Sequence, residues 1–234
     1  MEVKKDDFSF EESLKYLDSI ASQLHDGVEI PELHSMQAGD FMPNKVIKVF
    51  GTAMYIKVTN NMLGTNCFKS RQYAVNTVTN LILKILQTNK MLTHLNQQTD
   101  GSLLVVYDTP MKKDVEDMIN LAGQVRSINE VAMKKFHLEM SDQTVSIGMD
   151  YGPIYTYSSG ESFIGSICTG VPLKAAKVLA ECKEDNVIIS DDIYINLPED
   201  LRKHLFQNED VERNIKYHYS PLINLRMRKW VMEH

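Results

Sequence analysis

A lysine stands inside one of the most apolar stretches of the chain. The run AMYIKV at residues 53–58 is short and rich in β-branched and aromatic residues, which is typical of a strand packed on both faces. Lys57 interrupts this run, and an ammonium group in a central strand costs free energy unless it has a partner. A buried lysine of this kind forms an ion pair or contacts a phosphate as a point charge. Lys57 is therefore a candidate for either role.

Other patterns of reactive side chains argue against several kinds of site. The seven histidines are scattered, without the spacing of a metal motif such as H-E-x-x-H. The three cysteines include no C-x-x-C pair, which argues against a zinc site or a disulfide framework. The chain carries neither G-x-x-x-x-G-K-[ST] nor G-x-S-x-G. Asp191 and Asp192 follow a predicted strand, where two carboxylates suit a helix N-terminus.

Composition is that of an ordinary globular protein. The 234 residues are 43% hydrophobic and 24% charged, with a formal net charge of −6. A nucleic-acid-binding surface would need a basic excess, so we expect no nucleic-acid partner. No run approaches the roughly 18 apolar residues of a membrane span, and the charged start MEVKKDDFSFEES is unlike a signal peptide. We therefore expect a cytoplasmic protein without a membrane role of its own.

The first 44 residues read as an extension to the main body. Residues 9–24 predict an amphipathic helix, with Ser9 and Glu12 forming a capping box. Residues 26–44 hold two glycines and two prolines and read as a connecting segment. The helix packs either on the body or on a second copy or another protein. We predict a helical extension over 1–44 and one domain over 45–234.

Strands and helices alternate along the body. Strands are predicted over 46–58, on both sides of an Asp-Gly turn within 94–108, in two pieces over 144–158 broken at Asp150–Gly152, over 186–190, and within 223–234. Helices are predicted over 68–92, 112–136 and 171–183, with a further helical turn capped by Ser190 or Asp191. This order predicts an α+β fold with helices on one face of a mostly antiparallel sheet.

Three stretches together resemble the class III nucleotidyl cyclases, the family of adenylate and guanylate cyclase catalytic domains. AMYIKVTNN resembles the family's apolar strand ending in Asp-Ile-x-Gly, and QQTDGSLLVVYDTP resembles its Gly-Asp hairpin. VSIGMDYGPIYTY and TGVPLKAAKVLAE resemble the Ile-Gly strand and the later Gly-Asp-x-Val-Asn-x-Ala-x-Arg helix. The resemblance covers about residues 45–200 and implies a ferredoxin-like core and a homodimer with nucleotide sites at the subunit interface.

SIGMDYG and YDTPMKKDVEDM carry a closer likeness to the small bacterial cyclases of Pycsar antiphage defence, which make cyclic CMP or cyclic UMP. In the class III family the 3′-hydroxyl of a nucleoside triphosphate attacks the α-phosphate, and pyrophosphate leaves. Two aspartates hold two divalent ions that neutralise the phosphate charges. An asparagine and an arginine on the later helix, from the other subunit, orient the ribose and stabilise the transition state.

The family's site residues carry over unevenly. The second metal aspartate matches Asp100, although Thr99 replaces the glycine before it. The other positions have changed type. The first metal aspartate falls on Lys57, the asparagine on Lys174, the arginine on Val178, the aspartate of the helix motif on Val171, and the base-reading lysine of adenylyl cyclases on Asn96.

The resemblance makes Asp100 the expected partner of Lys57. An ammonium beside Asp100 would neutralise it without a metal and repel Mg²⁺, which is usually held by just one or two protein carboxylates. The Lys57–Asp100 pair is then either an inert remnant of a metal site or part of a phosphate-binding site in which Lys57 and Lys174 replace the metals. Asp100 is thus a remnant metal-site carboxylate, and Lys57, Asn96, Asp100 and Lys174 are the expected nucleotide-binding residues. We expect no metal and no other cofactor.

These substitutions predict a catalytically degenerate cyclase homologue, a nucleotide-binding or regulatory protein linked to nucleotide or cyclic-nucleotide signalling and antiphage defence. The alternative is an active pyrimidine nucleotide cyclase that makes cyclic CMP or cyclic UMP from CTP or UTP with Mg²⁺ or Mn²⁺. That alternative requires a second carboxylate near Asp100, such as Asp108 or Asp150. A third hypothesis is a structural partner of another protein, contacted through the N-terminal helix. Whether the protein is an enzyme stays open at this stage.

Overall fold

The structure is a computed structural model that describes residues 32–33, 46–60, 68–135, 143–157 and 167–233. Contacts divide the chain into two units, Met1–Pro31 and Glu32–His234, and all described residues belong to the second. The helix predicted over 9–24 lies outside the described residues. None of the described helices is both long and apolar enough to cross a bilayer.

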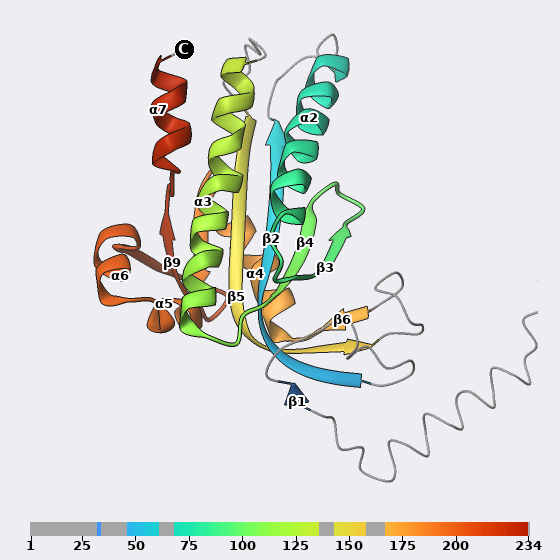
Figure 1. The fold of residues 1–234 in the computed structure, drawn as a ribbon, viewed down its shortest axis with the longest axis vertical. Coiled ribbons are helices and arrows are strands. Elements are labelled where there is room, and N and C mark those ends of the chain that lie inside the picture. Colours follow the sequence, from blue (N-terminus) through green and yellow to red (C-terminus); the bar gives the residue numbers. More distant parts are fainter. Residues whose placement is uncertain (1–31, 34–45, 61–67, 136–142, 158–166, 234) are drawn as a thin grey trace, which may run out of the picture. The chain divides into compact units, whose positions relative to one another are not determined.

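One mixed sheet organises the second unit (Figure 1). Its strands lie in the order β3-β4-β2-β5-β7-β9-β8, with β1 paired to β2 and β6 paired to β5. Neighbours along this path are antiparallel, except for the parallel pair β5–β7. The strands are β1 (Glu32–Leu33), β2 (Val46–Asn60), β3 (Leu92–Gln97), β4 (Leu103–Asp108), β5 (Gln143–Tyr157), β6 (Ile167–Thr169), β7 (Val187–Ser190), β8 (Asn208–Glu212) and β9 (Ile215–Ser220).

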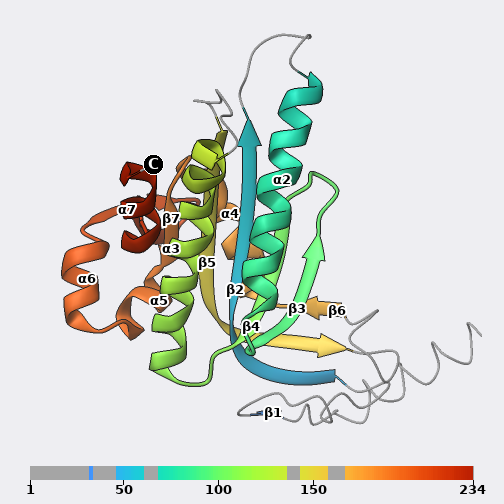
Figure 2. The ribbon, with the colours of Figure 1, turned by 45° about the horizontal axis from the view of Figure 1, so that its top comes forward.

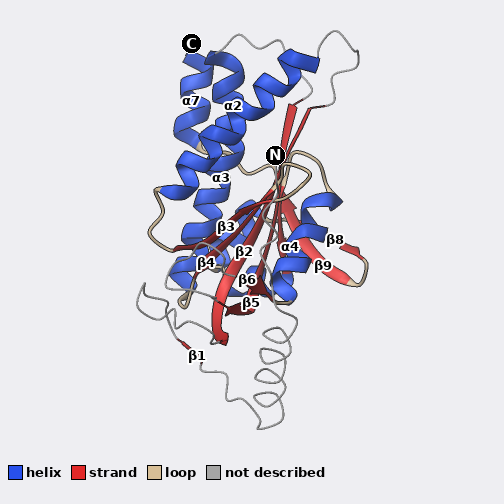
Figure 3. Cartoon of the chain, turned by 90° about the vertical axis from the view of Figure 1, so that its right-hand side faces the viewer, coloured by secondary structure: helices blue, strands red, loops and turns tan. Residues whose placement is uncertain are grey.

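Helices cover both faces of this sheet (Figure 3). The helices are α2 (Phe68–Gln87), α3 (Lys112–Lys135), α4 (Val171–Cys182), α5 (Asp191–Asn196), α6 (Glu199–Leu205) and α7 (Leu225–Glu233). Along β2, Met54 and Ile56 join the core beneath α2 and α3, whereas Ala53 and Tyr55 join the core beneath α4. This alternation follows from the two-residue repeat of a strand. The α+β class and the mostly antiparallel sheet are confirmed.

The prediction that the helices lie on one face is wrong for α4. This helix packs on the face opposite α2 and α3, mainly against β5 and β2. The contact is very close at Gly148, where an added Cβ would lie 2.0 Å from the backbone oxygen of Ala176. The alanines of α4, in VPLKAAKVLAEC, allow the helix to pack closely over Gly148. The sequence alone does not predict this contact, because it depends on the register of the folded sheet.

Two further predictions fail for local reasons. β5 is one strand across Asp150–Gly152, because it pairs with β2 without a break from Gln143–Asn60 to Tyr157–Val46, and this long pairing overrides the turn signal of the glycine. The end of the chain forms the helix α7, not a strand. Its start is capped by the Asn224 side chain, whose Oδ1 accepts a hydrogen bond of 3.1 Å from the Met227 amide.

Other boundaries agree closely with the sequence. The helices predicted over 112–136 and 171–183 end within one residue of α3 and α4. The helix predicted over 68–92 ends earlier, at Gln87, and its last residues form a turn before β3. Ser190, one of the two predicted caps, accepts a hydrogen bond from the Ile193 amide at the start of α5. Figure 2 displays β3 and β4 beside α2, where their hairpin carries Asp100.

Candidate functional site

The hairpin between β3 and β4 presents an aspartate held by two hydroxyl groups. The Ser102 amide donates a hydrogen bond of 3.0 Å to Oδ1 of Asp100, and the Ser102 hydroxyl donates to the same oxygen. The Tyr55 hydroxyl on β2 donates a hydrogen bond of 3.2 Å to Oδ2 of Asp100. The Ser102 hydroxyl also contacts the Tyr55 hydroxyl. Both oxygens of Asp100 therefore accept hydrogen bonds from neighbours in the same chain.

Local chain geometry places this carboxylate. Gln98 and Ser102 close the hairpin with a backbone hydrogen bond of 2.8 Å, and Gly101 adopts φ +83° within it. That left-handed conformation favours glycine because a Cβ would be strained there. The carboxylate of Asp100 folds back onto the amide two residues later, as aspartates in turns commonly do.

Hydrogen bonding sets the charge of this cluster. The hydrogen bond from Ser102 holds the pKa of Asp100 below its ordinary value, so the carboxylate is ionised at neutral pH. Burial, with the nearby charge of Asp100, raises the pKa of Tyr55 and keeps its hydroxyl a donor. Asp100 itself is exposed, whereas Tyr55 and Ser102 are buried. Tyr55, Asp100 and Ser102 thus form a cluster in which one exposed carboxylate is hydrogen-bonded by two buried hydroxyl groups.

The cation near this carboxylate comes from α4. Lys177 lies with its Nζ 5.8 Å from the centre of the Tyr55 ring, and its positive charge contributes to the lowered pKa of Asp100. Glu181, one turn further along α4, acts electrostatically on Tyr55. Sequence reasoning missed Tyr55, Ser102 and Lys177. An Asp-Gly-Ser turn signals the role of Ser102, but the approach of α4 depends on tertiary packing.

Lys57 does not form the expected ion pair with Asp100. No salt bridge joins these two described residues, because the carboxylate turns back toward Ser102 and Tyr55. Lys57 is half-buried on β2, opposite Ser146 of β5. It shares the α4 face of the sheet with Tyr55, two residues earlier. The residue of β2 that reaches Asp100 is Tyr55.

The other predicted site residues lie on or beside the same face. Asn96 and Tyr55 both pair with Leu104, so the three lie in one row across β3, β4 and β2. Asn96 is exposed near the hairpin. Lys174 is exposed on α4, one turn before Lys177 and Val178 and one turn after Val171. The structure thus brings Asn96, Asp100 and Tyr55 to one end of the sheet and adds Lys177 in place of Lys57.

Asp108 and Asp150 do not supply a second carboxylate beside Asp100. Asp108 ends β4, five residues beyond Leu103 and about 17 Å along the strand. Asp150 pairs with Ala53 in the middle of the sheet, where burial raises its pKa and Ser190 donates a hydrogen bond. In the part of the chain that the structure describes, no group of three or more His, Cys, Asp and Glu side chains is placed to hold a metal ion.

Comparisons with known proteins identify the fold. No protein-family model matches the sequence, and no curated protein matches it. Among solved structures, the adenylyl cyclase CyaB from Pseudomonas aeruginosa superposes with a TM-score of 0.58 at 11% identity, over 75% of this chain and 95% of CyaB. The non-canonical dimeric guanylyl cyclase domain of the RhoGC fusion protein from Blastocladiella emersonii superposes with a TM-score of 0.55 at 13% identity, over 78% of this chain and 99% of that domain.

A third similar structure is named a class III adenylyl cyclase-like ATP-binding protein, from Pseudomonas aeruginosa. It superposes with a TM-score of 0.57 at 14% identity, over 94% of this chain and 50% of the other. The chain therefore has the fold of class III nucleotidyl cyclase catalytic domains, while identities this low leave its chemistry to be argued from its own residues.

Proposed function

We propose that the protein is a catalytically degenerate class III nucleotidyl cyclase homologue that binds a nucleotide or cyclic nucleotide without turning it over. One observation carries this proposal. Lys57 stands on β2 at the position that matches the family's first metal aspartate, and the β2 side chain that reaches Asp100 is the Tyr55 hydroxyl, so β2 supplies no second carboxylate for two-metal catalysis. A tyrosine with a raised pKa stays neutral at pH 7 and is a poor ligand for Mg²⁺. The described residues around Asp100 do not fit a pair of divalent ions.

The helix α4 supports the same proposal. Its positions that match the family's ribose and transition-state residues carry Lys174 and Val178. A valine cannot donate a hydrogen bond to a developing oxyanion, as the family's arginine does. These substitutions affect both metal binding and transition-state stabilisation, because only one of the two metal-binding carboxylates, Asp100, is retained and the stabilising donor is absent.

Lysines on the α4 face provide a basis for nucleotide binding without a metal. Lys177 lies beside the Tyr55 ring, Lys174 lies one turn away, and Lys57 shares the face of Tyr55. Lysine binds phosphate as a point charge. We propose that these lysines take the triphosphate and that Asn96 lies toward the base. The Pseudomonas aeruginosa relative named as an ATP-binding protein lends this proposal a precedent within the fold.

We further propose a cytoplasmic homodimer that acts in cyclic-nucleotide signalling in antiphage defence. The dimer is supported by the similarity to the dimeric guanylyl cyclase domain. The defence role rests on the Pycsar-like stretches SIGMDYG and YDTPMKKDVEDM. A second proposal is that residues 1–26 contact another protein, and deletion of that segment tests it. Loss of a native complex on deletion would assign the contact to it.

A combined turnover and binding assay tests the proposal. Purified protein is mixed with ATP, GTP, CTP or UTP, with and without Mn²⁺, and cyclic products are measured by mass spectrometry. Thermal stabilisation by the triphosphates and their cyclic products is measured on the same samples. We expect metal-independent stabilisation by at least one nucleotide and no cyclic product. Cyclic CMP or cyclic UMP formed with Mn²⁺ would instead establish the active pyrimidine cyclase.

A further inference from the structure

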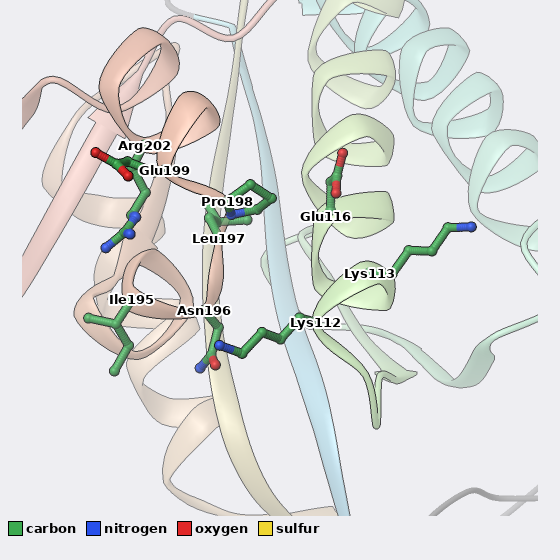
Figure 4. Close-up of a pocket in the computed structure, with 9 residues that line it drawn as sticks. All are labelled: Lys112, Lys113, Glu116, Ile195, Asn196, Leu197, Pro198, Glu199 and Arg202. Atoms are coloured by element: carbon green, nitrogen blue, oxygen red, sulfur yellow. The ribbon is translucent and has the colours of Figure 1, made fainter.

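The segment formed by α5 and α6 has few buried side chains. Of residues 191–205, Ile193 and Leu197 are buried. A cavity of about 340 Å³ separates the segment from the first turn of α3, with Asn196 on one side and Lys112 on the other (Figure 4). The closest neighbours of α5 are the strands β5, β7 and β9. The position of the segment therefore depends on the contacts that α5 makes with the sheet.

The first of these contacts joins α5 to a buried histidine on β9. His218 is 2% exposed, and its Nε2 lies 3.0 Å from Oδ1 of Asp191. The Tyr194 ring stacks on the imidazole, with ring centres 3.6 Å apart and an angle of 8° between the planes. Histidine is the side chain that ordinarily changes charge between pH 5 and 8. Protonation strengthens both contacts, because the imidazolium pairs with a carboxylate and lies over an aromatic face as a cation.

Other charged groups surround this pair. The hydrogen bond from His218 holds the pKa of Asp191 below its ordinary value, so the carboxylate is ionised across this pH range. Lys216 on β9 lies 3.6 Å from the same oxygen of Asp191 and 3.1 Å from Glu209 on β8. Glu209 also pairs with His218 across the β8–β9 ladder. Arg202 of α6 lies 5.7 Å from the centre of the ring that stacks on the imidazole. Lys216 thus maintains part of the contact when the histidine is neutral, and His218 adds the part that depends on pH.

The second contact joins α5 to a buried acid on β5. Asp150 is 5% exposed, and its Oδ1 has no hydrogen-bond partner in the described chain. The Ser190 hydroxyl donates to the Asp150 carboxyl group and accepts a hydrogen bond of 3.4 Å from the Ile193 amide, which caps α5. Burial outweighs the Ser190 hydrogen bond and raises the pKa of Asp150, and the charge of Asp192 on α5 raises it further. Ionisation of Asp150 therefore places an incompletely hydrogen-bonded negative charge near Asp192 at the start of α5.

We infer that α5 and α6 form a pH-sensitive segment that is held against the sheet at acidic pH and opens more often as the pH rises. β5 and β9 flank β7, which leads directly into α5. Asp150 and His218 therefore act on two successive residues, Ser190 and Asp191, from the strands on either side. Loss of a proton from either group weakens the attachment, so the two effects add. The inference does not depend on nucleotide binding.

Hydrogen exchange of the purified protein without nucleotide, followed by mass spectrometry, tests this inference. After correction for the intrinsic exchange rate, peptides from residues 191–205 should be about tenfold more protected at pH 5.5 than at pH 8, as for a shift of one pKa unit in one group. Peptides from α3 should change less than about threefold, because a local opening leaves them covered. Equal changes in the two sets of peptides would overturn the inference, because the whole fold would then respond to pH.

Variants assign the effect to the two buried groups. His218→Phe keeps an aromatic ring against α5 and removes the charge, so it should abolish most of the pH dependence. Asp191→Asn removes the other half of the ion pair at a half-exposed position and should act in the same direction, even if His218→Phe does not fold. Asp150→Asn should raise the protection at pH 8, because the buried negative charge is gone.

His204→Gln is the matched control, because His204 is an exposed histidine of α6. This variant should keep the pH dependence of the unaltered protein. Equal protection of residues 191–205 at the two pH values in the unaltered protein would overturn the inference. A pH dependence that survives in both Asp191→Asn and Asp150→Asn, or that is lost equally in His204→Gln, would also overturn it.

Discussion

The Tyr55 hydroxyl on β2 donates a hydrogen bond of 3.2 Å to Oδ2 of Asp100 in the β3–β4 hairpin. This contact joins two residues 45 positions apart at the end of the sheet where a metal-dependent cyclase would need two facing carboxylates. It gives Asp100 a donor from within the chain, and the positive charge of Lys177 adds a smaller contribution to the lowered pKa of Asp100. The interpretation of this site as catalytically degenerate depends on this contact.

The first prediction concerns the pKa of Asp100. Ser102→Ala removes the largest cause of its lowered pKa, so the pKa should rise toward the ordinary value of 3.8. Tyr55→Phe should raise it by less, because the Tyr55 hydrogen bond contributes less. Carboxyl carbon shifts in an NMR titration report the change. Thr99→Ala, in the same turn, is the control, and an unchanged pKa in Ser102→Ala would contradict the hydrogen-bond account.

The sign of the effect on stability follows from the lowered pKa. A carboxyl whose pKa is depressed by folding stabilises the folded state above its unfolded pKa of about 3.8, and this contribution is lost as the pH falls through the folded pKa. Asp100→Asn should therefore lower the Tm slightly at pH 7 and leave it unchanged at pH values below the folded pKa. The exposure of Asp100 keeps the effect small.

Asp150 should behave in the opposite way. Burial raises its pKa, and its Oδ1 is buried without a hydrogen-bond partner in the described chain. A carboxyl with a raised pKa contributes stability that is present below the unfolded pKa of about 3.8 and is lost as the pH rises through the folded pKa. Asp150→Asn should therefore raise the Tm at pH 7 by a few degrees, and the gain should shrink near pH 4.

Thermal unfolding of Asp150→Asn across pH 4 to 8 checks this sign. Asp117→Asn makes the same chemical change at an exposed position of α3 and should have little effect at any pH. A lower Tm for Asp150→Asn at pH 7 would show instead that the ionised carboxylate stabilises the sheet. The account of Asp150 as a buried structural group would then be wrong.

Gly148 should be essential for the seating of α4. A Cβ at this position would lie 2.0 Å from the Ala176 oxygen and 2.4 Å from the Ala180 nitrogen, both backbone atoms. Gly148→Ala must therefore displace α4 and should destabilise the fold by about 2 kcal/mol or more. Gly152→Ala is the control on the same face of β5, where a Cβ meets a side-chain atom of Pro172 at 3.2 Å. Equal losses in the two variants, measured by denaturant unfolding, would count against the close contact.

Lysine variants test which cation takes the phosphates. Lys177→Gln should reduce nucleotide-induced thermal stabilisation the most, because Lys177 is the lysine whose charge acts on Asp100. Lys57→Gln and Lys174→Gln should reduce it less. Lys134→Gln, exposed near the far end of α3, should leave it unchanged. An equal response in Lys177→Gln and Lys134→Gln would remove Lys177 from the proposed site.

The sequence predicts the elements better than their contacts. The 3.6-residue repeat of α3 and the Asp-Gly turn before β4 are local signals, and both elements form where predicted. The face occupied by α4 depends on Gly148 meeting Ala176, a relationship between residues far apart in the chain. The strand break predicted at Gly152 is absent for the same reason. Gly51 of β2 pairs with Gly152 of β5, so the pairing of the two strands continues through this position.

The sequence likewise points to one residue of the candidate site but not to the residues that contact it. Asp100 was identifiable because it lies in a short turn with a motif-like neighbourhood. The hydrogen-bond partners of Asp100 cannot be predicted in this way, because the side chain of an aspartate in a turn can point in several directions and the sequence does not determine which one. Lys57 and Tyr55 lie two residues apart on the same face of β2, and only the register with β4 selects Tyr55.

The most direct test of the central claim is product formation by the purified protein. Purified protein that is stabilised by a nucleotide is incubated with ATP, GTP, CTP and UTP in the presence of Mn²⁺, and cyclic nucleotides are quantified by mass spectrometry. The account predicts stabilisation by nucleotide without metal and no cyclic product from any of the four. A cyclic product that depends on Mn²⁺ and is lost in Asp100→Asn would contradict it and establish an active cyclase.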